Sequence, residues 1–166
     1  MESIVKTQTG GTLEFVSDPM FVPLNYQDFF VPSLNAMRQL MPSIELYTKE
    51  QFFSILNWVI GMDWTTGRGF VNVMRSADGT LLGYGCGYEA NQPFDTKRNL
   101  HTVAIYSKTK NTRQTIELVE HGKQYAKEFG YDTISGVGGR LNGSRRRFWQ
   151  EKLGFQISYI GFIYHV

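Results

Sequence analysis

Three cations surround the predicted start of a helix near Thr112. Lys108, Lys110 and Arg113 stand in the stretch that leads into this helix, and no acidic residue stands among them. The free N–H groups of a first helical turn carry partial positive charge and normally favour acidic side chains. Cations here therefore indicate an anion site, in which amide groups and side chains bind phosphate oxygens. The alternative is a solvated basic loop, because a surface cation near a helix start costs only about 0.3–1 kcal/mol.

A second basic group follows, in which Arg140, Arg145, Arg146 and Arg147 fall within eight residues. Residues 108–152 carry ten Lys and Arg against five Asp and Glu, a net charge of +5, whereas the rest of the chain carries −3. Such clustering suits the phosphates of a nucleic acid, whose binding weakens steeply with salt. Three consecutive arginines spread over about 200° of a helix, however, so a solvated helix face is the competing interpretation.

Other catalytic groupings are missing from the sequence. No carboxylate pair, zinc-ligand spacing or Ser-His-Asp arrangement stands out. Cys86 is the single cysteine, so it forms no intrachain disulfide, and its apolar, glycine-rich surroundings favour a buried packing role. His121 and His165 have no partner that the sequence identifies.

The composition is that of one globular domain covering residues 1–166, with 42% hydrophobic and 19% charged residues and a net charge of +2. No run of about 18 apolar residues is present, so no segment is expected to span a membrane. The first residues lack the apolar centre of a secretory signal. We therefore expect a cytoplasmic protein.

The pattern of strands and helices indicates an α/β fold with a mixed, mostly antiparallel central sheet and helices on both faces. Thr48 and Gln51 form a capping-box pair before an apolar helical stripe. Four prolines make the segment before Pro42 irregular, with a short helix around Leu34–Leu40. A strand, helix and strand over 99–137 predict a parallel pair. The other strands are expected at 12–17, within 69–89 around the turn 77–80, and at 156–166; a further helix is expected at 142–155.

Two local motifs in this order resemble the GCN5-related N-acetyltransferases (GNAT). The family's donor-binding loop runs Pro-x-x-Arg/Gln-Gly-x-Gly-x-Gly/Ala and enters a helix with a Leu-Leu pair. It aligns without a gap, with Ser107 on the proline, Lys110 on the Arg/Gln and Leu118-Val119 on the leucine pair. "FWQEKLGF" at 148–155 is similar to the family's "FYEKLGF". The resemblance covers residues 99–155 most closely.

The resemblance implies an enzyme that moves an acetyl group from acetyl-CoA to a primary amine by direct attack. It implies that the backbone N–H near Ile105 polarises the thioester carbonyl and that the following loop holds the pyrophosphate. The implied donor-binding residues are Ile105, Lys108, Lys110, Asn111, Thr112, Arg113, Gln114, Thr115 and Asn142. Two candidates to accept the proton of the amine lie near the expected groove: Glu89 at a strand end and His101 on the strand before the loop.

The chain also departs from the family's pattern. Asn111, Arg113 and Thr115 replace three glycines that let backbone amides approach the pyrophosphate. Gln150, or Trp149 with a one-residue slip, replaces the tyrosine that often serves as general acid. These departures favour an alternative, a catalytically silent domain of the same fold such as a viral or phage component associated with a virion. A nucleic-acid binder is a third interpretation. The part of the terminal strand at 158–166 is expected to pair with a second chain if the protein is a homodimer.

Overall fold

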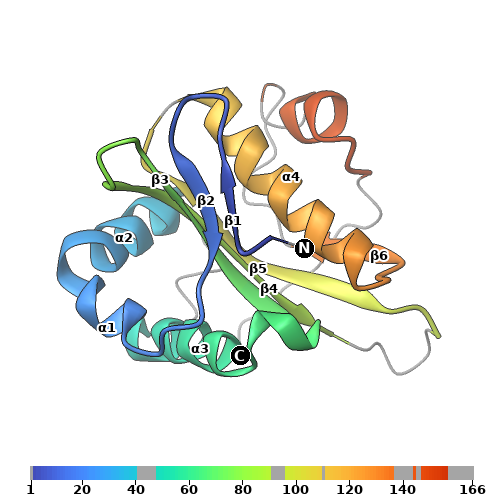
Figure 1. Ribbon diagram of the computed structural model, residues 1–166, viewed down its shortest axis with the longest axis horizontal. Helices are drawn as coiled ribbons and strands as arrows, with labels where there is room; N and C mark the ends of the chain where they lie inside the picture. Colours follow the sequence, from blue (N-terminus) through green and yellow to red (C-terminus); the bar gives the residue numbers. More distant parts are fainter. Residues whose placement is uncertain are drawn as a thin grey trace, which may run out of the picture.

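A six-stranded sheet lies at the centre of the computed structural model, which describes residues 2–40, 48–90, 96–109, 111–136, 144 and 147–156. The strands follow the chain in the order β1-β2-β3-β4-β5-β6, and all neighbours are antiparallel except β5 and β6. The predicted mixed sheet and its parallel pair are therefore confirmed (Figure 1). The strands are β1 (Ile4–Lys6), β2 (Thr12–Phe15), β3 (Gly69–Arg75), β4 (Leu81–Glu89), β5 (Asn99–Ser107) and β6 (Thr133–Gly136).

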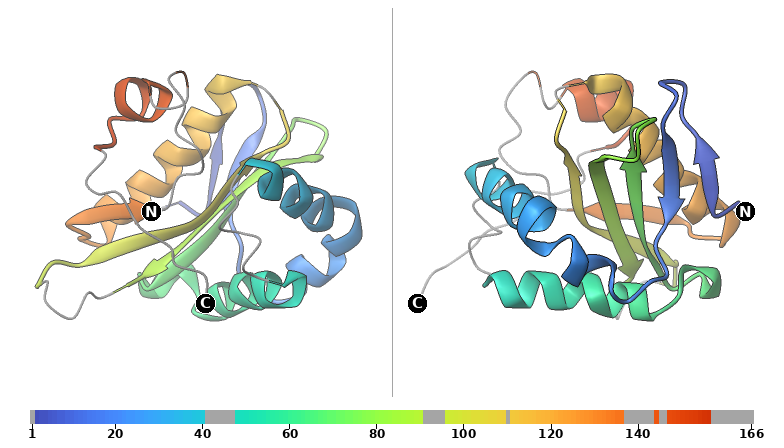
Figure 2. Two further views of the ribbon diagram at one scale, coloured as in Figure 1. Left: turned by 180° about the vertical axis from the view of Figure 1, so that it is seen from behind. Right: turned by 60° about the vertical axis from the view of Figure 1, so that its left-hand side comes forward.

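Helices cover both faces of this sheet, as predicted. α4 (Thr112–Glu128) crosses one face, and α1 (Phe21–Leu24), α2 (Val31–Leu40) and α3 (Lys49–Gly61) cover the other (Figures 1 and 2). Each face has its own hydrophobic cluster: Phe30, Leu56 and Tyr84 belong to the cluster under α1–α3, and Phe70 and Tyr125 belong to the one under α4. Shorter helical turns are η1 (Tyr26–Phe30), η3 (Trp64–Thr66) and η4 (Phe148–Lys152).

The start of α3 follows directly from the sequence. Gln51 donates its backbone N–H to Thr48 Oγ1 over 3.1 Å, and Thr48 donates its own N–H to Gln51 Oε1 over 2.9 Å. Two of the free donors at the start of the helix are satisfied in this way. The predicted capping box is confirmed.

The N-terminal segment is more regular than we predicted. Helical structure begins at Phe21 and continues through η1 and α2, so the expectation of an irregular stretch before Leu34 was wrong, while the short helix expected around Leu34–Leu40 is confirmed within α2. Pro32 lies where η1 passes directly into α2, so this proline does not end the helical structure. The edge strand β1 was also not predicted, because three residues are too few to show a periodic pattern.

Three glycines of β4 lie on the face of the sheet that α4 covers. The backbone alternates along "GYGCGY", so Tyr84 and Cys86 enter the core under α1–α3, while Gly83, Gly85 and Gly87 lie on the other face. A Cβ atom at Gly85 would lie 2.5 Å from Asn72 Oδ1, which is too close. The expected packing role of Cys86 is confirmed, since it is 1% exposed.

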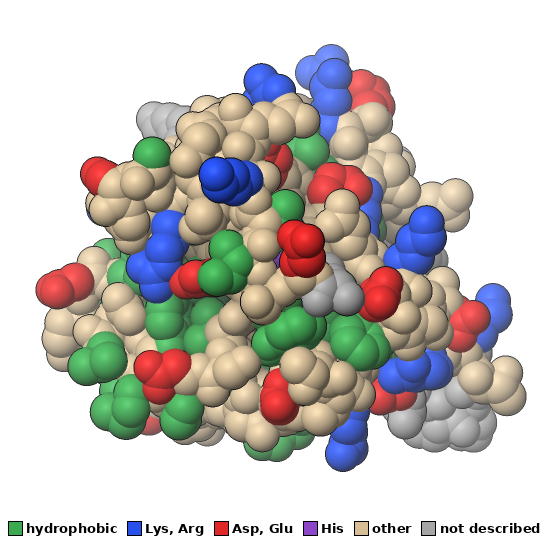
Figure 3. All heavy atoms as spheres, in the orientation of Figure 1, with side chains coloured by type: hydrophobic (Ala, Val, Ile, Leu, Met, Phe, Trp, Pro, Cys, Tyr) green, Lys and Arg blue, Asp and Glu red, His purple; other side chains and the backbone are tan. Residues whose placement is uncertain are grey.

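Hydrophobic side chains are also exposed around α1. Met20 is 52% exposed and Leu24 73%, and Figure 3 shows hydrophobic side chains gathered at the lower left, over α1. Within the described part of the chain, no helix combines the length and the apolar character needed to cross a bilayer. The predicted strand 156–166, and with it the surface proposed for dimerisation, lies outside the described residues except for Gln156.

Candidate functional site

The distinctive feature of the sheet is the end of β5, which runs on past the end of β6. β6 pairs with β5 from Asn99 to Thr102, whereas β5 continues to Ser107. The register between β4 and β5 shifts at this point, because Gly87 lies opposite Thr102 and Cys86 lies opposite Ala104. Val103 is therefore a bulge residue, and bulges bend a strand and change the direction of its neighbouring groups.

Beyond the bulge, alternate backbone groups of β5 face away from β4. Lys108 donates its N–H to Leu82 O over 2.7 Å, which identifies the residues that hydrogen-bond to β4 as Lys108, Tyr106 and Ala104. The N–H groups of Ile105 and Ser107 consequently point toward the side on which β6 pairs earlier in the strand. No strand among the described residues pairs with β5 there. Ile105 thus offers a backbone donor at the place predicted for it.

A small cavity lies between this part of the sheet and α4. Its volume is about 30 Å³, enough for one or two water molecules. Asn72 is fully buried there, and its Oδ1 has no hydrogen-bond partner among the described residues. The lining is mostly apolar and consists of Phe70, Asn72, Gly85, Cys86, Leu100, Thr102, Ile105, Leu118, Val119, Gly122, Lys123, Ile134 and Phe155.

The start of α4 lies just beyond Ser107. Asn111, which precedes the helix, accepts hydrogen bonds from some of the free backbone N–H groups of the first helical turn. Asn111 is the N-cap: its Oδ1 accepts the N–H of Arg113 at 3.0 Å, and its carbonyl accepts the N–H of Thr115 at 3.3 Å. The N–H groups of Thr112 and Gln114 make no hydrogen bond to a described residue. Among the described residues, these two backbone donors have no acceptor at this helix end.

The three cations of the loop are not equivalent. Arg113 donates its Nη2 to Gln8 Oε1 in the turn between β1 and β2, so its side chain connects α4 to that turn. Lys108 is exposed beside the helix start. Lys110 and the predicted donor-binding residue Asn142 lie outside the described residues. The Gln114 side chain contacts the hydroxyl of Thr109.

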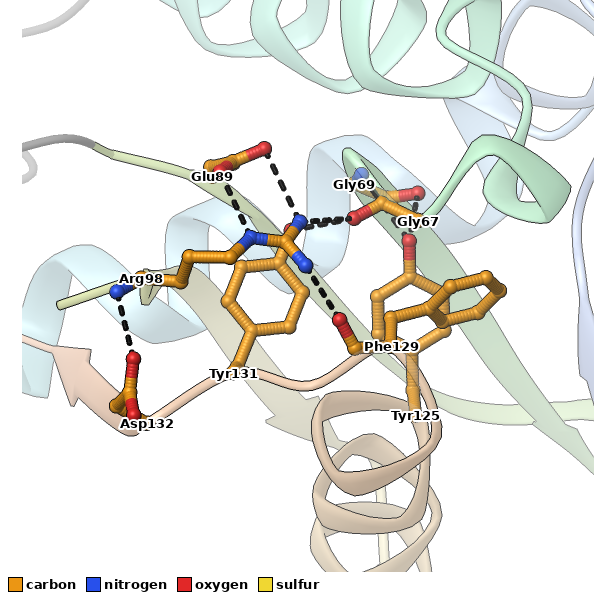
Figure 4. A network of polar contacts seen from close by, with 8 residues as sticks. All are labelled: Gly67, Gly69, Glu89, Arg98, Tyr125, Phe129, Tyr131 and Asp132. Atoms are coloured by element: carbon orange, nitrogen blue, oxygen red, sulfur yellow. Dashed lines mark hydrogen bonds and ion pairs between the residues drawn. The ribbon is translucent and has the colours of Figure 1, made fainter.

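Glu89 is held in an ion pair. Arg98 donates its Nε to Glu89 Oε1 over 3.1 Å and its Nη2 to Glu89 Oε2 over 3.3 Å (Figure 4). Arg98 also donates to Phe129 O at the end of α4 and lies 4.4 Å from the ring centroid of Tyr131. The Glu89 side chain is thus part of a contact that ties β4 to the C-terminal end of α4.

His101 lies on the opposite face of the sheet from Glu89. It is the register partner of Tyr88, and the two rings pack edge to face at 5.8 Å. Its Nδ1 lies 3.3 Å from Ser135 Oγ, and burial lowers the pKa of the imidazole. The structure therefore does not bring the two predicted proton acceptors together. His101 is the one beside the gap at the end of β6.

The other described histidine, His121, has a structural environment. His121 is 2% exposed, stacks on Phe15 at 4.2 Å and has its Nδ1 3.2 Å from Asn72 Nδ2. Burial lowers the pKa of His121 to about 4. Asn72 is the partner that the sequence did not reveal, because it lies 49 residues away. No group of three or more potential metal ligands occurs among the described residues.

The segment in place of the family's tyrosine is also packed. Trp149 lies in η4, with its ring edge to face with Phe155 at 5.5 Å. Phe155 lines the cavity under α4 and lies 5.3 Å from the Lys123 ammonium. Neither Trp149 nor Gln150 supplies a phenol, as the sequence indicated.

Comparison with known proteins identifies the fold of this chain but no relative by sequence. No protein-family model matches the sequence, and no protein of curated function matches it. Solved structures do match over nearly the whole chain. An aminoglycoside acetyltransferase from an uncultured soil metagenomic sample is 15% identical, with a TM-score of 0.66 over 96% of this chain and 98% of that one.

Two other matches have different named substrates. A glucosamine-6-phosphate N-acetyltransferase from Arabidopsis thaliana is 11% identical, with a TM-score of 0.65 over 92% of this chain and 97% of that one. A ribosomal-protein-alanine N-acetyltransferase from Brucella melitensis biovar Abortus 2308 is 15% identical, with a TM-score of 0.61 over 93% and 97% of the two chains. The six-stranded sheet with its parallel β5–β6 pair and these matches show that the chain has the GNAT acetyltransferase fold.

Proposed function

We propose that this protein is an N-acetyltransferase that moves an acetyl group from acetyl-CoA to a primary amine at the gap beside β5. The observation that carries the proposal is that the edge of β5 facing away from β4 has no strand partner beyond Thr102 among the described residues, immediately after the bulge at Val103. An extended donor can pair with such an edge in place of a strand. The match to acetyltransferase structures supports the same reaction class.

The helix start and the edge of β5 that faces away from β4 are suited to two parts of this donor. Thr112 and Gln114 provide backbone N–H groups for the pyrophosphate, and Lys108 adds positive charge, in our proposal together with Lys110 and Asn142. Asn111, Arg113 and Thr115 shape the same turn through the hydrogen bonds described above. The cavity under α4 is too small for the pantetheine arm, so in our proposal this arm lies along the edge of β5 that faces away from β4.

The reaction needs little from the protein beyond positioning, because a thioester is already activated. The amine nitrogen attacks the carbonyl carbon, a C–N bond forms and the C–S bond breaks. The amine proton is finally carried by the thiol that leaves. The N–H of Ile105 stabilises the carbonyl oxygen as negative charge develops, and His101 is the side chain that we place at the reacting groups. Glu89 has a structural role in this proposal because Arg98 occupies its carboxylate.

A proline substitution tests the phosphate site without removing the helix. Thr112 is the first residue of α4, where proline is well tolerated, and Asn111 has the extended backbone that a following proline requires (φ −78°, ψ 103°). Thr112→Pro removes one proposed donor N–H, while the control Thr112→Ala keeps it. Since a hydrogen bond to a charged group contributes about 1.5–3 kcal/mol, we expect T112P to weaken acetyl-CoA binding at least tenfold in calorimetry.

The same measurements separate this proposal from the silent-domain alternative. Equal affinity of T112P and T112A for acetyl-CoA would contradict the proposed phosphate site. Absence of binding to the wild-type protein at millimolar acetyl-CoA would contradict the enzyme. Binding without transfer to any of a broad panel of primary amines would favour the catalytically silent domain.

A further inference from the structure

Four polar side chains form a continuous row across the paired ends of β5 and β6. Thr133 Oγ1 donates to Asn99 Oδ1 over 2.9 Å, and Asn99 Nδ2 donates to Ser135 Oγ over 2.8 Å. Ser135 Oγ then lies 3.3 Å from His101 Nδ1. Asn99 and Thr133 are register partners, as are His101 and Ser135, so all four side chains lie on one face of the sheet.

In the structure the row has one direction, because Asn99 Nδ2 faces Ser135 and Asn99 Oδ1 faces Thr133. The Asn99 side chain is buried, and its Oδ1 can only accept while its Nδ2 can only donate. Because Nδ2 faces Ser135, the Ser135 oxygen accepts that hydrogen bond. An oxygen that accepts a hydrogen bond becomes a stronger donor, since the bonds of a chain polarise one another. The Ser135 hydroxyl has no other acceptor among the described residues than His101 Nδ1.

We propose that Asn99 and Ser135 are positioning residues that hold neutral His101 with its proton on Nε2, so that the imidazole presents a hydrogen-bond donor to the site. Nδ1 is then occupied as the acceptor of the Ser135 hydroxyl. Nε2 makes no hydrogen bond to a described residue and faces a ligand as an N–H group. A neutral imidazole can stabilise a developing oxyanion in this way without becoming charged.

The catalytic consequence rests on the proposed acetyl transfer. In that reaction His101 donates a hydrogen bond from Nε2 to the bound substrates, while the Ile105 N–H serves the carbonyl oxygen, and the row keeps His101 from acting as a base through Nε2. The opposite direction of the row, with the Asn99 oxygen toward Ser135, would leave Nε2 free of a proton and make His101 a base. The two directions therefore predict different chemistry for the same ring.

Nitrogen-15 NMR of the wild-type protein decides between the two tautomers without any substrate. The spectrum is recorded well above the ordinary histidine pKa of about 6.5, so that the ring is neutral. We expect the Nε2–H tautomer at His101. His121 is an internal reference with the same expected tautomer, because Asn72 Nδ2 faces its Nδ1. The Nδ1–H tautomer at His101 would overturn the proposal.

Substitution of Asn99 should reverse the tautomer. In N99D the carboxylate only accepts, so it takes the Ser135 hydroxyl hydrogen, and Ser135 Oγ then accepts from His101 Nδ1–H. We expect the His101 signals to change to the Nδ1–H pattern while those of His121 stay the same. The double variant N99D/S135A lacks the connecting hydroxyl and should lose this reversal. An unchanged His101 tautomer in a folded N99D protein would contradict the proposal that the hydrogen bonds of this row determine which nitrogen of His101 carries the proton.

Kinetics test the catalytic role separately. Glutamine at position 101 can donate a hydrogen bond but cannot take up a proton at neutral pH. We expect H101A to lower kcat about 100-fold, as loss of an oxyanion donor does, and H101Q to recover at least tenfold of that loss. Equal activity of H101Q and H101A would overturn the donor role. Absence of acetyl transfer by the wild-type protein would contradict the proposed function, while the NMR result would still decide the direction of the row.

Discussion

At the scale of single residues, the structure separates side chains that look alike in the sequence. His101 and His121 both have pKa values lowered by burial, but His121 is enclosed between Phe15 and Asn72, whereas His101 is half-buried next to the gap beside β5. In the sequence, Glu89 and His101 are equal candidates to accept the proton of the amine. Arg98 binds the carboxylate of Glu89 from the face on which α4 lies, so only His101 remains for the other face.

The ion pair of Glu89 leads to a prediction about activity. Glu89→Gln keeps the shape of the side chain and removes its charge, so the contact with Arg98 weakens. We expect the free energy of unfolding to fall by about 1 kcal/mol and kcat to stay within about twofold of the wild type. Chemical denaturation and steady-state kinetics measure the two effects. A loss of activity of 100-fold or more in a stable E89Q protein would show that Glu89 takes part in the chemistry.

The buried His121 predicts that the protein loses stability in acid. Its folded-state pKa of about 4 lies below the ordinary value of 6.5, so the unfolded chain binds the proton more tightly. This contribution is fully present above about pH 6.5 and is lost as the pH falls toward 4, by up to about 3 kcal/mol. Denaturation curves at several pH values should show a smaller decrease for His121→Gln than for the wild type. Parallel pH dependences of the two proteins would contradict this origin.

At the scale of elements, the glycines of β4 explain how closely α4 packs on the sheet and how closely β5 lies to β4. A Cβ atom at Gly83 would lie 2.6 Å from the backbone oxygen of Tyr106, whereas one at Gly87 would lie no closer than 3.3 Å to any atom. Gly122 in α4 has the same role, since a Cβ atom there would lie 3.1 Å from the Phe70 ring. Glycine at position 122 therefore allows α4 to pack closely on β3.

This difference gives a matched pair of variants. Gly83→Ala forces the backbones of β4 and β5 apart, and we expect it to cost about 2–3 kcal/mol of unfolding free energy, as overpacking does. Gly87→Ala requires shifts of only a few tenths of an ångström, so it should cost less than half as much. Chemical denaturation measures both values. Equal costs would mean that contact with Tyr106 does not limit the position of β5.

Elements with a strong local pattern were predictable from the sequence, and contacts between distant residues were not. The capping box at Thr48 and the parallel unit around α4 follow from spacing alone. The helical structure before Leu34 was missed because its prolines suggested interruption, whereas the short helix around Leu34–Leu40 was expected. The row from Thr133 to His101 connects residues more than 30 positions apart, and no periodicity in either strand marks it.

At the scale of the whole molecule, the GNAT fold brings the end of β5, the start of α4 and the cavity between them into one region. The departures from the family's pattern are consistent with this arrangement. Asn111 caps the helix where the family has glycine, and Arg113 turns to Gln8. The donors left at Thr112 and Gln114 are the basis for assigning a phosphate site.

The central claim is that acetyl-CoA occupies the gap beside β5, and titration of the isotope-labelled protein with acetyl-CoA tests it most directly. We expect the backbone amide signals of Ile105, Thr112 and Gln114 to move progressively and to saturate, while those of β1 and α3 stay in place. Amide signals that remain unchanged at millimolar acetyl-CoA, or that change only elsewhere in the protein, would contradict the claim.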